Sequence, residues 1–161
     1  MKSYEKTINS YEKKYEKKGS RKLSDLKGYF SDSRSYGEML AKKDITVYET
    51  FTKSDSPMKY TLTVVHPGRV GKEFFMTKGH IHGNKTEELY ILLEGKGKLL
   101  LQRSGKVKVI DLKKGEIVLI EKGWAHRLVN DGRNKLKVHT IYHENSKPNY
   151  SVKFKKIFKK K

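Results

Sequence analysis

Three histidines and one glutamate have the residue types and the spacing to hold a metal ion. Side chains alternate between the two faces of a β-strand, so His80 and His82 point to the same side. After a short polar turn a second strand is expected from Glu87, and it would direct Glu88 toward the two histidines. His126 lies in a Gly-containing bend before another strand and supplies a fourth ligand. Three neutral imidazoles and one carboxylate are typical of a site for one divalent first-row transition metal.

Short strands are the elements expected to position these ligands. From Ile45 onward apolar and polar residues alternate, and turn pairs such as Pro67-Gly68 and Ser104-Gly105 separate the runs. Many short strands without an intervening helix predict an all-β sandwich or barrel. The expected strands are Ile45–Phe51, Lys59–His66, Glu73–Ile81, Glu87–Leu93, Gly97–Arg103, Val107–Leu112, Glu116–Ile120, His126–Asn130 and Leu136–Tyr142.

Short helical segments are predicted ahead of the strands. Ser33 is expected to cap a helix over Tyr36–Lys42, with Met39 and Leu40 facing the core. A stripe of apolar residues at helical spacing lies further upstream, among Lys and Glu. This stripe fits either an amphipathic helix or a frayed tail, and Gly19-Ser20 would end it. The stripe consists of Tyr4, Ile8, Tyr11 and Tyr15.

The length of 161 residues suits one domain with one hydrophobic core. We expect residues 1–20 to form a Lys- and Tyr-rich extension, residues 21–150 the folded domain and residues 151–161 a basic tail. The tail alternates apolar and basic residues, which favours an added edge strand. The apolar residues of that strand would be Val152, Phe154 and Ile157.

Composition excludes several classes of protein. The sequence has no apolar run of membrane-spanning length and no apolar segment near its start, so neither a membrane span nor a signal peptide is expected. We therefore expect a cytoplasmic location. The absence of cysteine excludes disulfides and thiolate ligands. A net charge of +19 suggests nucleic acid as a partner, but much of it lies in the two tails, which carry no RNA-binding signature. Lys-rich solvated tails are the preferred interpretation.

Two motifs around the ligands resemble those of the cupin family. GHIHGNKTEELYILLEG contains the HxH, Glu and Gly of the first cupin motif, and GEIVLIEKGWAHRLVN follows the second, with Glu121 in place of the usual Pro. The resemblance implies a double-stranded β-helix, or jelly-roll barrel, as the fold.

A longer match is more specific. RKLSDLKGYF, VVHPGRVGKEFFMTKGHIHGNKTEELYILLEGKGKLLLQ and GWAHRLVN are similar to the cupin-type glucose-6-phosphate isomerases, in order from Arg21 to Tyr142. The resemblance implies a homodimeric enzyme of glycolysis and gluconeogenesis that interconverts glucose 6-phosphate and fructose 6-phosphate. It also implies one divalent metal per subunit, Fe2+ in the first place, with Mn, Ni or Zn as alternatives.

Roles for site residues follow from the same resemblance. His80, His82, Glu88 and His126 would hold the metal, and Glu88 is the one ligand that could also act as a base. Tyr90 shares the inward face of Glu88 and would either hydrogen-bond the sugar or serve as an ordinary barrel aromatic. The residues implied for the substrate's phosphate are Thr63, Thr77, Gly79 and Tyr142.

The chain departs from the family pattern after Tyr142. Members of the family continue to a His-x-Tyr element that helps to hold the phosphate, whereas here Pro148 occupies the His position and Tyr150 is retained. His143 or Lys147 would be the substitutes for the missing imidazole. This departure keeps open a second hypothesis, a non-catalytic or differently specific metal-binding cupin for another phosphosugar or anion. A protein that binds nucleic acid through its tails is the third.

Overall fold

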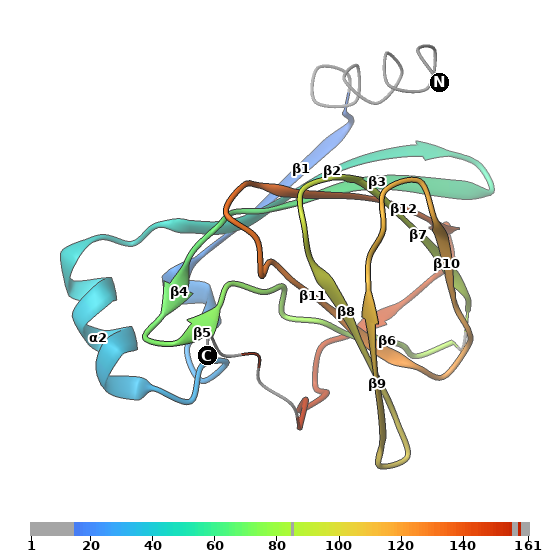
Figure 1. Ribbon diagram of the computed structural model, residues 1–161. Coiled ribbons are helices and arrows are strands. Elements are labelled where there is room, and N and C mark those ends of the chain that lie inside the picture. The colour runs from blue at the N-terminus through green and yellow to red at the C-terminus, as the bar shows by residue number, and fades with distance from the viewer. Residues whose placement is uncertain (1–14, 85, 156–157, 159–161) are drawn as a thin grey trace.

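A computed structural model describes residues 15–84, 86–155 and 158 and shows an all-β barrel with one α-helix beside it (Figure 1). No helix among these residues is long and apolar enough to cross a membrane. The helical elements are the 3-10 turn η1 (Leu23–Leu26) and α2 (Ser33–Lys42). The strands are β1 (Lys17–Lys22), β2 (Thr46–Asp55), β3 (Met58–Val65), β4 (Arg69–Val70), β5 (Glu73–Phe74), β6 (Ile81–His82), β7 (Glu88–Glu94), β8 (Lys98–Arg103), β9 (Lys106–Asp111), β10 (Ile117–Ile120), β11 (Ala125–Val129), β12 (Leu136–His143) and β13 (Pro148–Asn149).

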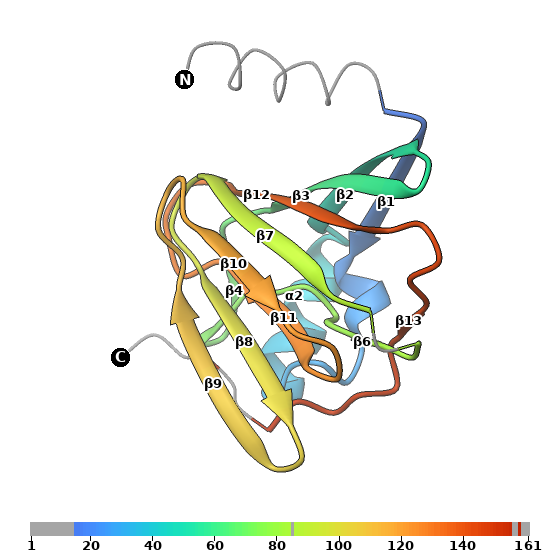
Figure 2. The same cartoon turned by 90° about the vertical axis from the view of Figure 1, so that its right-hand side faces the viewer.

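Two sheets make the walls of the barrel. One has six strands in the order β1-β2-β3-β12-β7-β10, and the other has three in the order β11-β8-β9 (Figure 2). Two short pairs, β13-β6 and β4-β5, complete the strand pairings. The pairings of these strands are antiparallel, which is the arrangement expected for short strands joined by tight turns. The all-β barrel expected from the sequence is confirmed.

The interior of the barrel is apolar in one part and polar in another. Leu23, Phe75, Leu99 and Leu136 are at most 1% exposed and belong to one hydrophobic cluster. Polar side chains are buried elsewhere in the interior, and burial of such groups is costly unless they are paired or bind a ligand. These buried polar residues include Thr61, Thr63, Glu88, His126 and Thr140.

One expected strand is wrong in extent. The strand predicted over Glu73–Ile81 stops at Phe74, and β6 starts only at Ile81. Gly79, between them, has a φ of +70°, a left-handed conformation that extended strands do not use. The segment between β5 and β6 therefore pairs with β11 only at isolated bridges, Met76 with Val129 and His80 with His126. The other expected strands are found with their ends shifted by a few residues.

The helix α2 starts earlier than expected because a different residue caps it. The Asp32 side chain accepts a hydrogen bond of 2.9 Å from the Ser35 N–H, so the helix begins at Ser33 and the predicted Ser33 cap is wrong. Met39 and Leu40 pack against the hydrophobic core, as predicted.

The start of the described chain forms a strand across the expected boundary at residue 20. Gly19 and Ser20, predicted to end a helix or tail, lie inside β1 opposite Thr50 and Glu49 of β2. A Cβ on Gly19 would lie 2.5 Å from Thr50 Oγ1, so the missing side chain lets β1 pass this residue. Of the predicted apolar stripe, Tyr15 packs edge-on against Phe51, with ring centroids 5.2 Å apart. The stripe residues Tyr4, Ile8 and Tyr11 lie outside the described residues.

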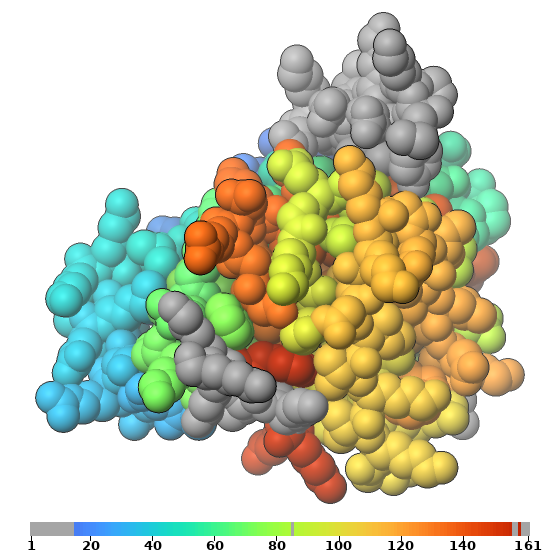
Figure 3. All heavy atoms as spheres, in the orientation of Figure 1, coloured from blue at the N-terminus to red at the C-terminus, as the bar shows by residue number. Residues whose placement is uncertain are grey.

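The predicted edge strand near the C-terminus is absent from residues 151–155, which instead form an irregular segment attached to β8. Gln102 of β8 fixes this segment twice, since its amide donates to the Lys153 carbonyl and accepts from the Lys155 N–H, both at 2.9 Å. In the space-filling view this segment, in red, lies between the green β4–β5 hairpin and the yellow β8 and β9 (Figure 3). Ile157 lies outside the described residues. We call residues 151–155 the C-terminal strap.

Candidate metal and substrate site

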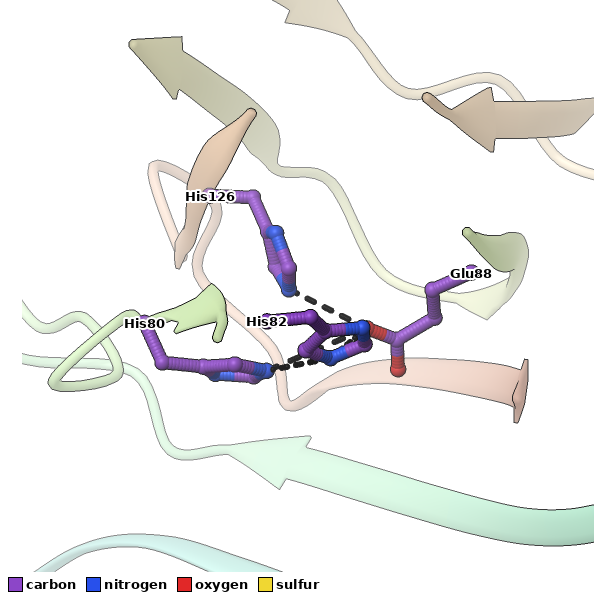
Figure 4. Close-up of side chains that lie close together, drawn as sticks. All are labelled: His80, His82, Glu88 and His126. Carbon is purple, nitrogen blue, oxygen red and sulfur yellow. Dashed lines mark hydrogen bonds and ion pairs between the residues drawn. The ribbon is translucent and has the colours of Figure 1, made fainter. Parts of the chain in front are cut away.

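The four predicted metal ligands lie together inside the barrel. Figure 4 shows their side chains converging from β6 and the residue before it, from β7 and from β11. His80 Nε2 lies 3.0 Å from His82 Nε2, and Glu88 Oε2 lies 3.1 Å from His126 Nε2 and 3.4 Å from His82 Nε2. One ligand atom from each of the four falls within 4.8 Å of all the others. We call these four residues the metal cluster.

Backbone pairing explains why ligands far apart in sequence meet. His80 and His126 exchange two backbone hydrogen bonds of 3.0 and 2.8 Å, which fix the segment before β6 against β11. Glu88 is the first residue of β7 and is held between Ile120 of β10 and Tyr142 of β12. Glu88 and Tyr90 share the buried face of β7, as their spacing predicted. The cluster is therefore built by strand register rather than by loops.

Two of the imidazoles are oriented by hydrogen bonds at the opposite ring nitrogen. His82 Nδ1 lies 3.2 Å from the carbonyl oxygen of Thr86, and His126 Nδ1 lies 3.1 Å from that of Trp124. A carbonyl oxygen only accepts, so the tautomer protonated at Nδ1 satisfies each carbonyl and leaves Nε2 able to bind a metal. This arrangement is the usual second contact of a metal-binding histidine.

The cluster has the unpaired atoms that a bound cation would satisfy. Among the described residues, Glu88 Oε2 and His126 Nε2 have no hydrogen-bond partner, although the two side chains are only 4% and 2% exposed. Leaving such buried acceptors unpaired is costly. Three imidazole nitrogens and one carboxylate oxygen match the donors that divalent first-row metals accept. The residues therefore fit a metal of this kind.

The charge states of the cluster suit the same purpose. Burial raises the pKa of Glu88, but contacts with His126 and His82 outweigh burial and bring that pKa to about 2. Burial, with the neighbouring His126, lowers the pKa of His80 to about 3. At neutral pH the carboxylate is ionised and the imidazole of His80 is neutral, which is what a metal ligand requires.

A cavity of about 440 Å³ opens beside the cluster and is lined by residues of β1, β2, β3, β7 and β12. Its volume lies in the range of small-molecule sites. The structure places each further predicted site residue in its lining: Thr63, Thr77, Gly79, Tyr90 and Tyr142.

Hydrogen-bond donors dominate one part of the lining. Thr77 Oγ1 accepts a 3.1 Å bond from the Leu128 N–H, so its own hydroxyl proton is available to a ligand. Tyr142 shares a 2.9 Å bond with Thr61, which in turn shares a 2.8 Å bond with Thr52. We call the hydroxyls of Thr63, Thr77 and Tyr142, together with the Gly79 N–H, the donor set.

The segment that departs from the family pattern also borders the cavity. Pro148 pairs with His82 through β13 and β6, and the Tyr150 ring lies 5.5 Å from that of His80. His143 and Lys147 do not line this cavity, so neither replaces the missing imidazole as expected. The sequence does not predict three cations of the lining: Lys17, Arg21 and Lys59. Lys17 and Arg21 lie on β1, a strand that the expected N-terminal extension does not include. A pattern of alternate threonines, which β2 and β3 both carry, was the available signal for this wall.

The barrel and the metal cluster together define a cupin. Among solved structures, the chain is similar to a cupin-2 domain protein from Rhodospirillum rubrum (TM-score 0.52, 13% identity, 64% of each chain covered). A mutant of Bacillus subtilis oxalate decarboxylase gives a TM-score of 0.55 at 16% identity, over 66% of this chain and 29% of that protein. At such identities the similarity shows the fold alone.

Sequence comparison then gives the family. The family profile for glucose-6-phosphate isomerase matches residues 20–157. The chain is 39% identical over 150 residues to glucose-6-phosphate isomerase of Pyrococcus abyssi and 37% identical to that of Thermococcus litoralis, in each case covering 89% of this chain and 79% of the relative. A putative glucose-6-phosphate isomerase of Rhizobium meliloti is 29% identical, over 81% of this chain and 64% of its own. The chain belongs to the glucose-6-phosphate isomerase family, in its cupin form.

Proposed function

We propose that the protein is a metal-dependent aldose–ketose isomerase that interconverts glucose 6-phosphate and fructose 6-phosphate. One observation carries the metal dependence: the buried metal cluster, with Glu88 Oε2 and His126 Nε2 unpaired, beside a cavity of about 440 Å³. The reaction itself rests on membership of the family. Action as a homodimer in the cytoplasm remains a prediction of the resemblance.

In this proposal the metal cluster binds one divalent ion per subunit through His80, His82, Glu88 and His126. Fe2+ is the proposed ion, and Mn, Ni and Zn are alternatives because nitrogen and oxygen ligands accept all of them. Such an ion acts as a Lewis acid that polarises a carbonyl group.

Glu88 and Tyr90 are the proposed catalytic residues. Isomerisation moves a hydrogen between C2 and C1 of the sugar, and an ionised Glu88 carboxylate would accept a proton in that exchange. Tyr90 is 6% exposed and burial raises its pKa well above the ordinary value, so its hydroxyl stays protonated and donates to a sugar oxygen. Incorporation of solvent deuterium at C2 or C1 would support proton transfer, whereas retention of the substrate hydrogen would support a hydride shift.

The donor set is the proposed phosphate site. Three hydroxyls and one N–H provide donors for phosphate oxygens. Lys17, Arg21 and Lys59 add positive charge to the same cavity and favour entry of an anion.

The deciding experiment is an assay of fructose 6-phosphate conversion by purified protein before and after a chelator removes metal. Turnover that is lost with the metal and returns with added Fe2+, Mn2+, Ni2+ or Zn2+ supports the proposal and ranks the metals. Fully metallated, folded protein without turnover would refute it. Mannose 6-phosphate should be assayed in parallel, because the same donors suit its phosphate.

A second candidate is a cupin that binds another phosphosugar or anion without this reaction. Pro148 favours it, because a proline at the position of the family's imidazole supplies no side-chain donor to the ligand. Binding of glucose 6-phosphate without turnover would favour this alternative.

A further inference from the structure

Arg127 is a buried cation directly behind the donor set. Its side chain is 5% exposed and lies between two aromatic rings, with the guanidinium carbon 4.3 Å from the centroid of Phe154 in the C-terminal strap and 5.5 Å from that of Tyr29. Although it follows the metal ligand His126, Arg127 does not line the cavity. Successive residues of a strand face opposite sides, so Arg127 approaches the wall of the cavity from outside.

The Arg127 guanidinium donates two hydrogen bonds to a single backbone carbonyl oxygen. Arg127 Nη2 and Nε donate to the Lys78 carbonyl oxygen at 2.8 and 3.2 Å, and Nη1 contacts Met76 Sδ at 3.3 Å. Among the described residues no carboxylate pairs with Arg127. Burial lowers the pKa of Arg127 to about 10, so the guanidinium remains charged at neutral pH. A buried charge without a counter-ion is costly, and here only the Lys78 carbonyl and the two aromatic rings offset that cost.

Peptide geometry connects this carbonyl to the donor set. The Lys78 carbonyl and the Gly79 N–H belong to one peptide unit, and in a planar trans peptide they point in opposite directions. Because Arg127 holds the carbonyl from outside the cavity, the Gly79 N–H points toward the cavity, where it has no acceptor among the described residues. A donor bound to the carbonyl also polarises the amide and strengthens the N–H as a donor.

Close packing holds this peptide in place. A Cβ at Gly79 would lie 2.6 Å from the Phe154 ring and 2.7 Å from the His126 carbonyl oxygen, and its φ is +70°. The backbone at Gly79 is thus enclosed by the metal-bearing strand β11 and by the C-terminal strap.

We propose that Arg127 is a positioning residue for phosphate binding: it fixes the Lys78–Gly79 peptide with its N–H toward the substrate and places an uncompensated positive charge behind it. Phe154 shields that charge from solvent, which makes the C-terminal strap part of the anion site. The proposal deepens the proposed function and rests on it for the identity of the anion.

The test compares Arg127→Met, which removes the charge, and Arg127→Lys, which keeps the charge but not the paired donors. Arg34→Met is the matched control, since Arg34 pairs with Glu38 on exposed α2. Each metallated protein is assayed for kcat and KM with fructose 6-phosphate, for binding of inorganic phosphate by calorimetry, and for metal content. We expect Arg127→Met to weaken phosphate binding and raise KM about ten- to a hundredfold, with much smaller changes in kcat and metal content. Arg127→Lys should fall between it and the wild type.

If the role of Arg127 were purely structural, Arg127→Met would lower the melting temperature and leave KM and phosphate affinity unchanged in the folded fraction. That result would overturn the proposal. If Arg127→Met does not fold, the same test is made with Phe154→Leu and Arg127→Lys. Each of these variants should still weaken phosphate binding. Absence of phosphate binding by the wild type would also overturn it. The proposed function fails separately, when wild-type protein binds phosphate but does not isomerise the sugar.

Discussion

The metal cluster and the donor set border one cavity but present opposite kinds of atom to it. The metal cluster brings lone pairs together, with one ionised carboxylate and Nε2 acceptors fixed by hydrogen bonds at Nδ1. The donor set offers hydroxyl and amide protons, contains no carboxylate, and has Arg127 behind it. The difference teaches how one cavity would serve the proposed function: lone pairs for a cation at the metal cluster and donated protons for a phosphate at the donor set.

Removal of a ligand imidazole should have the largest effect. We expect His126→Ala to lose the metal and to lower kcat/KM by at least about a thousandfold, because a three-ligand remnant holds the ion weakly and the carbonyl is no longer polarised. Metal analysis and the isomerase assay measure this. His66→Ala is the control and should keep its metal, because His66 contacts Glu49 and does not line the cavity. A metal-free but active His126→Ala would break the assignment of the cluster.

Chelation should separate the two regions. We expect metal removal to abolish turnover and lower the melting temperature, since a ligand of the folded state stabilises it. Inorganic phosphate should still bind the apo protein, because the donor set has its own scaffold. Calorimetry on apo and metallated protein checks this. Equal loss of phosphate binding would show that the two regions are a single site.

The hydrogen bond behind His82 should have an intermediate effect. Thr86 Oγ1 lies 2.9 Å from His82 Nδ1, so Thr86→Val removes one of the two oxygens at that nitrogen. We expect metal affinity to fall about tenfold, with little change in phosphate binding. Competition with a chromophoric chelator measures the affinity. Thr86→Ser keeps the hydroxyl and should behave as wild type.

A change in the donor set should weaken phosphate binding and leave metal binding unchanged. We expect Thr77→Val to raise KM for fructose 6-phosphate by about tenfold, through loss of one donor to phosphate, with metal content unchanged. Steady-state kinetics and metal analysis on the same preparation provide the measurement. Thr77→Ser is the control, and a fall in metal content with Thr77→Val would contradict the separation.

The smallest effect is expected at the edge of the sheet, where Glu49 pairs with Lys18 at 2.9 Å and with His66 at 3.0 Å. Burial raises the pKa of Glu49, but the hydrogen bonds from Lys18 and His66 outweigh it and leave the pKa lowered. A lowered folded pKa stabilises the fold above the unfolded pKa, and this contribution disappears as pH falls through the folded pKa. Glu49→Gln should therefore reduce the free energy of unfolding by about 1 kcal/mol or less at pH 7. Urea unfolding at pH 7 and in acid should show the difference shrinking in acid; a constant difference would argue against the ion pair.

The sequence predicted the metal cluster well because its members are side chains whose chemistry and spacing are visible. Two histidines at strand spacing and a glutamate at the start of the next strand were enough to predict that these three side chains lie together. The same alternation predicted the barrel strands to within a few residues, apart from the segment that Gly79 diverts.

The residues that surround the donor set are harder to predict from the sequence. Arg127 acts on a backbone carbonyl that its sequence position does not reveal, and Phe154 reaches it from a strap predicted to be a strand. β1 was missed because its residues are Lys, Gly, Ser and Arg, which have weak strand propensity, and its place in the sheet is set by pairing with β2. The conformation of these elements is set by their tertiary contacts rather than by local strand propensity.

The position of β12 has a consequence for the order in which the protein forms. β12 lies between β3, which carries Thr63, and β7, which carries Glu88, and its partners on both sides come from much earlier in the chain. Joining strands so distant in sequence costs chain entropy before the pairing repays it, so folding is expected on the order of milliseconds to seconds. Until β12 docks, the chain has neither a closed barrel nor a complete cavity. The donor set, which combines Thr63 of β3 with Tyr142 of β12, should therefore remain incomplete until this step.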